Sequence, residues 1–321
     1  NLRWLKISNE FGFIPWCGTF IEDVATNFYP TLKHYVDVDS ATAIPHALTY
    51  DRFIYENQQG LPDFDPVANI SYAWNVFANH SIPTSNFLVT HWYLLSSGAI
   101  PELGNRGVDF IGTHIPYDRW PDNYPGSWIN CGPYRLERNG WGGRGGSPYF
   151  YAGELNWNIG GQNYNFFNCL TEIQDDGGYE WFPEFNVNTA IARGIRHLRR
   201  AINSMALPTL FTHEDRIWMI ESEWRQTLAS ITSGLAASYP EYDLEYKSMD
   251  DACMYIRAKE NINISSVRTR TGFVDIHCIG DNDMATKCHL FTESGGQIEF
   301  VFVDLPQISA ASGTVVVTVN D

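Results

Sequence analysis

The sequence has little positive charge, because its 321 residues include 21 Lys and Arg against 37 Asp and Glu, a formal net charge of −16. Nucleic acids and anionic membrane surfaces would repel such a chain, so we expect neither as a partner. The sequence also lacks an apolar run of the length that a membrane span needs, which predicts no membrane insertion. The length is sufficient for one large α/β domain and a small additional module.

Cysteine is sparse, and none of the six cysteines belongs to a Cys-x-x-Cys pair. A structural zinc ribbon is therefore not expected, and the cysteine content leaves the redox compartment open. Cys278 and Cys288 flank a turn-like Gly-Asp-Asn-Asp segment, which suggests that they could bridge a hairpin.

Aromatic residues are abundant instead, with 11 Trp, 17 Tyr and 19 Phe. Residues 115–184 place many of them among Gly, Pro and Asn, where rings are suited to stack on a flat ligand such as a sugar. A long irregular connection of this kind is usually functional. We interpret it as the wall of a substrate cleft, with Trp120 and Trp141 as platforms and Arg144 holding the substrate. The alternative is an irregular insertion, with or without a hairpin, whose aromatic residues pack on one another.

The first 260 residues alternate strand-like apolar runs with amphipathic helical segments, which is typical of a parallel sheet or barrel. Helices are predicted near 1–9, 24–36, 67–79, 97–105, 189–205 and 216–237, and strands near 11–20, 43–46, 86–91, 108–113 and 207–213. After residue 260 the pattern changes to the period of antiparallel strands. We therefore expect an α/β domain over 1–260 and a small antiparallel β module over 261–321.

Several predicted strands end on a histidine. These residues are His46, His91, His114 and His213. The carboxyl ends of parallel strands meet on one face, so we expect these side chains to converge. Asp51 and Asp118 follow the first and third of them by a few residues, and imidazole with carboxylate is a ligand pair for a divalent ion. Each histidine taken alone also fits a structural role as a half-buried polar residue.

Three segments together resemble the NodB-type polysaccharide deacetylases. They are residues 46–51, the Leu210-Phe211-Thr212-His213 strand before a long helix, and the stretch from Tyr246 to Arg257. Residues 88–93 and 107–111 are similar to a divergent branch of that family. This branch includes fungal galactosamine-polymer deacetylases and a gut-bacterial deacetylase of terminal N-acetylgalactosamine on the blood-group A antigen.

The resemblance covers roughly residues 1–260. It implies an irregular (β/α) barrel that uses a divalent ion, with zinc, manganese, cobalt and nickel equally suitable. The implied reaction hydrolyses the N-acetyl group of an N-acetylhexosamine in a glycan, with N-acetylgalactosamine favoured, and releases acetate and a free amino sugar. The expected location is secreted or cell-surface, with a signal peptide outside this chain.

The same resemblance assigns roles to individual residues. His46 matches the metal-ligand histidine, Asp51 stands near the place of the second ligand, and His213 matches the general acid that protonates the leaving amine. The family's early Asp-Asp pair supplies one base and one further ligand. Here Glu22 and Asp23 form the acidic pair at an early strand end, although strand counting places it one β-α unit late.

Two explanations account for this late acidic pair. Either this branch moved its carboxylates to Glu22 and Asp23, or the original pair precedes Asn1, where the chain reads as the inside of a helix. We favour the first, with both residues catalytic and Asp23 also a metal ligand. His91 and His114 would complete the coordination or bind the substrate together with Asp118.

Two other functions fit parts of the pattern. A barrel glycoside hydrolase would use two carboxyl groups about 5–9 Å apart and no metal, and Glu22, Asp51, Asp118 or Glu154 could supply them. The histidines at the strand ends count against it. A non-catalytic carbohydrate-binding protein would keep the aromatic platforms and lack the metal site. A bound metal ion distinguishes the deacetylase from both.

Overall fold

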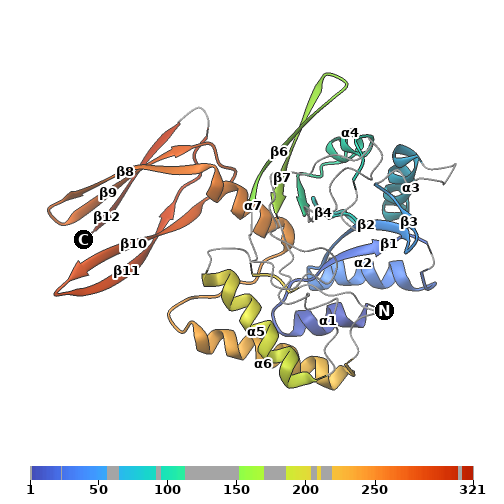
Figure 1. The fold of residues 1–321 in the computed structure, drawn as a ribbon, viewed down its shortest axis with the longest axis horizontal. Helices are drawn as coiled ribbons and strands as arrows, with labels where there is room; N and C mark the ends of the chain where they lie inside the picture. Colours follow the sequence, from blue (N-terminus) through green and yellow to red (C-terminus); the bar gives the residue numbers. More distant parts are fainter. Residues whose placement is uncertain are drawn as a thin grey trace, which may run out of the picture. The chain divides into compact units, whose positions relative to one another are not determined.

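The chain divides into two compact units, Asn1–Asp250 and Asp251–Asp321, so the division lies ten residues before the domain boundary expected at 260. It falls within the helix α7 (Met249–Glu260). The computed structural model, drawn in Figure 1, describes residues 2–22, 24–55, 65–91, 95–112, 152–169, 186–203, 208–210, 219–309 and 313–320. No helix in these described ranges is long and apolar enough to cross a membrane.

The described residues of the first unit form two sheets of mainly parallel strands. One sheet has the order β1-β2-β3, formed by β1 (Trp16–Phe20), β2 (Thr42–Thr49) and β3 (Arg52–Phe53). The other has the order β4-β5-β7-β6, formed by β4 (Phe87–Val89), β5 (Phe110–Gly112), β7 (Gln162–Cys169) and β6 (Ala152–Ile159). β3 and β6 run antiparallel to their neighbours, and the other pairs are parallel. The described strands form no closed barrel, so the (β/α) barrel stays a prediction.

Four helices of this unit begin close to the positions that the apolar spacing predicts. They are α1 (Arg3–Glu10), α2 (Phe28–Asp39), α3 (Pro66–Asn79) and α4 (Ala99–Asn105). In α3 the Asp65 carboxylate accepts a hydrogen bond from Val67 N at 2.9 Å, and Pro66 occupies the first helical position. Ile70 and Phe77 of α3 are fully buried in the core around the sheets.

Two further helices, α5 (Val187–Asn203) and α6 (Glu221–Ser238), pack closely because glycines face isoleucines between them. A Cβ added at Gly194 would lie 2.5 Å from Cδ1 of Ile231, and one at Gly234 would lie 2.5 Å from Cδ1 of Ile195. A larger residue at either glycine would require the facing isoleucine side chain to shift.

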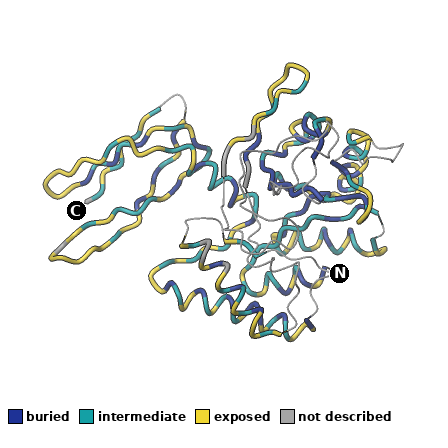
Figure 2. Tube along the Cα trace, in the orientation of Figure 1, coloured by how far each residue is buried: buried dark blue, intermediate teal, exposed yellow. Residues whose placement is uncertain are grey.

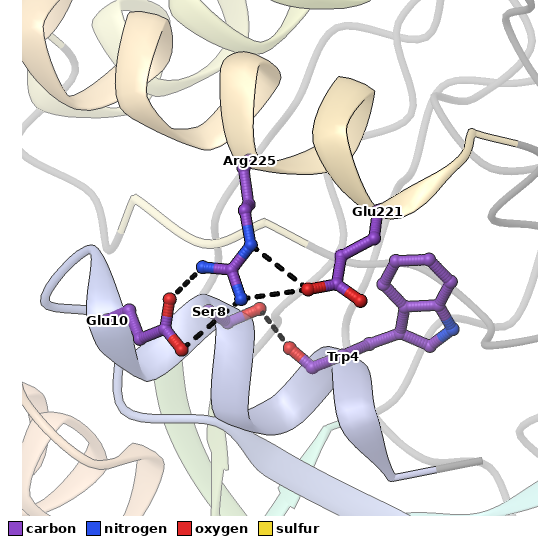
Figure 3. Close-up of polar contacts among 5 residues, drawn as sticks. All are labelled: Trp4, Ser8, Glu10, Glu221 and Arg225. Carbon is purple, nitrogen blue, oxygen red and sulfur yellow. Dashed lines mark hydrogen bonds and ion pairs between the residues drawn. The ribbon is translucent and has the colours of Figure 1, made fainter.

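The first helix of the chain also contacts α6. Trp4 meets Trp224 edge to face with ring centroids 6.2 Å apart. Figure 3 shows Arg225 of α6 between the carboxylates of Glu10 and Glu221, with a nitrogen–oxygen distance of 2.9 Å to Glu221. The aromatic contact contributes more than these ion pairs, because the charged groups are partly exposed to water.

The second unit is a β module of two sheets. One has the order β12-β9-β8, from β8 (Ile262–Arg270), β9 (Phe273–Gly280) and β12 (Thr314–Asn320), and the other pairs β10 (Thr286–Ser294) with β11 (Gln297–Leu305). A small core contains Ile276, Cys278 and Leu305. Figure 2 shows the exposed tip of the β8–β9 hairpin, with another at the β6–β7 hairpin of the first unit.

The hairpin bridge suggested for Cys278 and Cys288 is wrong. The two residues lie on β9 and β10, which belong to different sheets, and both thiols are free. The Gly-Asp-Asn-Asp segment therefore connects two sheets and does not close a hairpin. Burial raises the pKa of both thiols above the ordinary value, so they stay protonated at neutral pH.

Candidate functional site

The site begins at an irregularity in β2. Thr19 of β1 lies opposite Pro45 and Phe20 lies opposite Ala47, so His46 is an extra residue between two regular partners. Such a bulge redirects the side chain that it carries. His46 therefore lies inside β2, which continues to Thr49, and not at the strand end as the sequence suggested.

Gly18 on the neighbouring strand provides the space for the redirected ring. A Cβ at this position would lie 3.1 Å from Cβ and 3.2 Å from Cγ of His46, and 3.0 Å from Cη2 of Trp16. Phe20 covers the ring from the same strand, stacked at a centroid distance of 6.2 Å. β1 thus determines where the His46 imidazole can lie.

The second histidine of the site follows β4. His91 comes two residues after the last residue of that strand, Val89, and its side chain is buried. Its Nδ1 lies 3.0 Å from Nε2 of His46. The other nitrogen of each ring faces a backbone carbonyl, with Nδ1 of His46 2.8 Å from Val89 O and Nε2 of His91 3.0 Å from Tyr50 O.

These carbonyls determine the tautomers. A carbonyl oxygen only accepts hydrogen bonds, so Nδ1 of His46 and Nε2 of His91 must carry the hydrogens and donate them. The two remaining ring nitrogens, which in the neutral rings have lone pairs, then face each other. Two lone pairs repel, and this arrangement becomes favourable when they share a proton or coordinate the same cation.

Several features fit a cation. Histidines that bind metals almost always donate the outer ring N–H to a carbonyl or carboxylate, as both do here. Two nitrogens bound to one ion at about 2.0–2.1 Å would stand about 2.8–3.0 Å apart at octahedral angles and about 3.3–3.4 Å apart at tetrahedral angles. The observed separation of 3.0 Å matches the octahedral value.

Aromatic rings enclose His91. Phe20, Tyr50 and Phe53 lie with centroids 5.6, 5.6 and 4.9 Å from the imidazole, all near edge-to-face. They limit the access of water to the ring and strengthen electrostatic interactions there. Tyr50 is 54% exposed, so its ring also faces solvent beside the site.

A buried hydroxyl supports the bulge. Tyr55 donates its hydroxyl hydrogen to Pro45 O, the carbonyl that directly precedes His46. Complete burial holds the pKa of Tyr55 well above its ordinary value, so the hydroxyl remains a donor. Sequence reasoning missed Gly18, Tyr55 and the carbonyl acceptors, because no local pattern connects them to His46.

Two of the predicted carboxylates, Glu22 and Asp51, lie in the described part of the chain, at separate positions. Glu22 follows β1 and forms an ion pair with Arg52 of β3, while Asp51 lies in the exposed turn between β2 and β3. Tyr29 lies near this edge, donates to Ile21 O at 2.7 Å, and has its pKa raised to about 12, mainly by burial.

The structure brings together two of the predicted site residues, His46 and His91. No cluster of three or more His, Cys, Asp or Glu suited to a metal occurs within the described part of the chain. The other predictions lie outside the described residues, namely Asp23, His114, Asp118, Trp120, Trp141, Arg144 and His213.

Comparisons of the chain with protein-family models, with curated proteins and with solved structures find no significant match.

Proposed function

We propose that the chain is a metal-dependent hydrolase that removes the N-acetyl group from an N-acetylhexosamine in a glycan, with N-acetylgalactosamine favoured. The observation that supports it best is the convergence of Nε2 of His46 and Nδ1 of His91, each with the opposite ring nitrogen donating to a carbonyl. That is how two histidines are prepared to hold a divalent ion.

His46 and His91 would hold the ion, and Asp23 is the further ligand that the sequence predicts. A bound divalent ion supplies positive charge that polarises an amide carbonyl and acidifies water. Glu22 or Asp23 would accept the proton of the attacking water, and His213 would protonate the departing amine. Arg52 keeps the Glu22 carboxylate in place beside β1, as their ion pair shows.

No specific observation on the described carboxylates favours the glycoside hydrolase alternative. Glu154 lies exposed on the β6–β7 hairpin, where it accepts a hydrogen bond from Asn156 at 3.3 Å, and Asp51 lies in the exposed turn between β2 and β3. A sugar-binding protein without catalysis would have no need for two histidines with converging lone pairs. We therefore retain the deacetylase as the proposed function.

The test is acetate release from a panel of N-acetylhexosamine glycans, with and without a chelator. We expect release that stops with chelator and returns with a divalent ion. A new reducing end without acetate would identify a glycosidase, and neither product with retained sugar affinity would identify a binding protein.

Variants connect the activity to the site. His46→Ala and His91→Ala should each lose most of the bound metal, because each removes one of the two imidazole ligands. His34→Ala, on the exposed face of α2, is the matched control and should retain it. Full metal occupancy in both site variants would disprove the assignment.

A further inference from the structure

The strand that leads to His91 begins at an acidic anchor. One carboxylate oxygen of Asp250, in the first turn of α7, accepts three hydrogen bonds. The donors are Ser85 Oγ at 2.6 Å, Asn86 N at 2.9 Å and Phe87 N at 3.1 Å. Charge-assisted hydrogen bonds of this kind are among the stronger polar contacts in proteins.

The same short segment is tied to the other strands of the site. Ser85 N donates to Ala43 O of β2 at 2.7 Å, and Trp16 Nε1 of β1 donates to Phe87 O at 3.1 Å. Ser85 and Phe87 are buried. Without the carboxylate, the Ser85 hydroxyl and the Phe87 N–H would retain only the bonds between these two residues, Ser85 Oγ to Phe87 O at 3.2 Å and Phe87 N to Ser85 Oγ at 3.1 Å. Loss of the charged acceptor therefore weakens the hydrogen bonding of two buried groups, which destabilises this segment.

β4 consists of three residues, so a shift at its start is transmitted to its end. Val89 closes the strand and its carbonyl accepts the hydrogen bond from Nδ1 of His46. His91 follows two residues later and meets Nε2 of His46. The anchor and the histidine pair are therefore connected by a segment of seven residues, from Ser85 to His91.

We propose that Asp250 is a positioning residue of the histidine site. By fixing the start of β4, it places Val89 O where it selects the Nδ1–H tautomer of His46 and sets the distance between the two imidazoles. Two measurements test this proposal. The cobalt titration rests on the proposed function, whereas the NMR measurement of the histidine tautomers does not.

The first measurement uses NMR on the full chain with ¹⁵N-labelled histidine to determine which ring nitrogen of each histidine carries the hydrogen. The chain has nine histidines, and His46→Ala and His91→Ala assign the two signals. In the wild type without metal we expect His46 protonated at Nδ1 and His91 at Nε2. Asp250→Ala should convert His46 to a mixture of tautomers, because Val89 O no longer lies opposite Nδ1.

The second measurement is a cobalt(II) titration followed by visible absorption. Asp250→Ala should weaken cobalt binding about tenfold, which is in the range typical of groups that orient metal ligands. It should also change the absorption bands. Asp250→Asn retains one acceptor oxygen and should show a smaller effect. A general loss of stability would lower the midpoint of unfolding and leave the tautomers and bands of the folded protein unchanged.

Asp251→Asn is the matched control, because it removes the same charge from the exposed neighbouring position of α7. Unchanged tautomers in folded Asp250→Ala and Asp250→Asn would overturn the inference. If Asp250→Ala does not fold, Asp250→Asn decides. A wild-type chain that binds no cobalt would count against the proposed function and leave the NMR measurement to decide on Asp250.

Discussion

Gly18→Ala tests whether the space beside His46 is needed for the site. The added methyl would lie 3.0 Å from Trp16 and 3.1 Å from His46, closer than carbon atoms normally approach, so a neighbour must shift by a few tenths of an ångström. Trp16 is held by a hydrogen bond of 3.1 Å to Phe87 O and by an edge-to-face contact with the Phe87 ring. We therefore expect His46 to shift.

The magnitude follows from two opposing terms. Overpacking a close contact costs about 1–3 kcal/mol, and Gly→Ala at an ordinary φ returns about 0.4–1 kcal/mol by restricting the unfolded chain. Gly18 is not among the residues with positive φ, so the second term applies. The net loss in free energy of unfolding should lie between about 0 and 2.6 kcal/mol, with a central value of about 1.3 kcal/mol.

Gly18→Ala should also weaken metal binding, whereas the control variant should not. A shift of His46 changes both its 2.8 Å contact with Val89 O and its 3.0 Å contact with His91, and we expect about tenfold weaker binding, or about 1.4 kcal/mol. Denaturant unfolding and a cobalt titration measure the two quantities. Gly98→Ala, where the methyl would lie 3.3 Å from Pro66, is the control without a histidine neighbour. Unchanged cobalt affinity in Gly18→Ala would refute the reasoning.

Three further predictions concern other parts of the chain. Tyr50→Ala should raise KM for the glycan with little change in bound metal, because the exposed ring beside His91 is suited to stack on a sugar; Tyr72→Ala, similarly exposed on α3, should not. Tyr55→Phe should cost about 1–3 kcal/mol in denaturant unfolding by leaving the buried Pro45 carbonyl without its donor, and a smaller loss would show that water replaces it. The pKa of Asp275 is lowered by hydrogen bonds from Arg270 and Thr318, so its stabilisation is present above the pKa of the unfolded chain and lost as pH falls through the lower folded pKa. Asp275→Asn should make the acid side of the stability profile shallower, and an unchanged profile would contradict this.

Local patterns predicted the helices well. α3 begins at Asp65-Pro66 and buries its apolar face. The capping residue and the first apolar residues of the helix lie close together in the sequence. Such features are predictable because capping and periodicity involve residues close along the chain.

The favoured interpretation of residues 115–184 did not include the β6–β7 hairpin, which only the alternative allowed, although a local signal was present. Gly160 and Gly161 adopt φ values of 61° and 86°, as the central residues of a type I′ turn require, and a Gly-Gly pair between alternating residues is a hairpin signal. The many aromatic residues around it directed the interpretation to an irregular cleft wall.

The candidate site divides in the same way. The sequence by itself indicated that histidines occur at or near the ends of apolar segments, whereas the role of Gly18 became visible only in the fold. Only the tertiary structure decided that His46 and His91, separated by 45 positions, place two ring nitrogens 3.0 Å apart. The physical reason is that their tautomers and positions depend on carbonyls of Val89 and Tyr50. These carbonyls are more than 40 residues away from the histidines they contact and become neighbours only when β2 and β4, which belong to different sheets, come together in the fold.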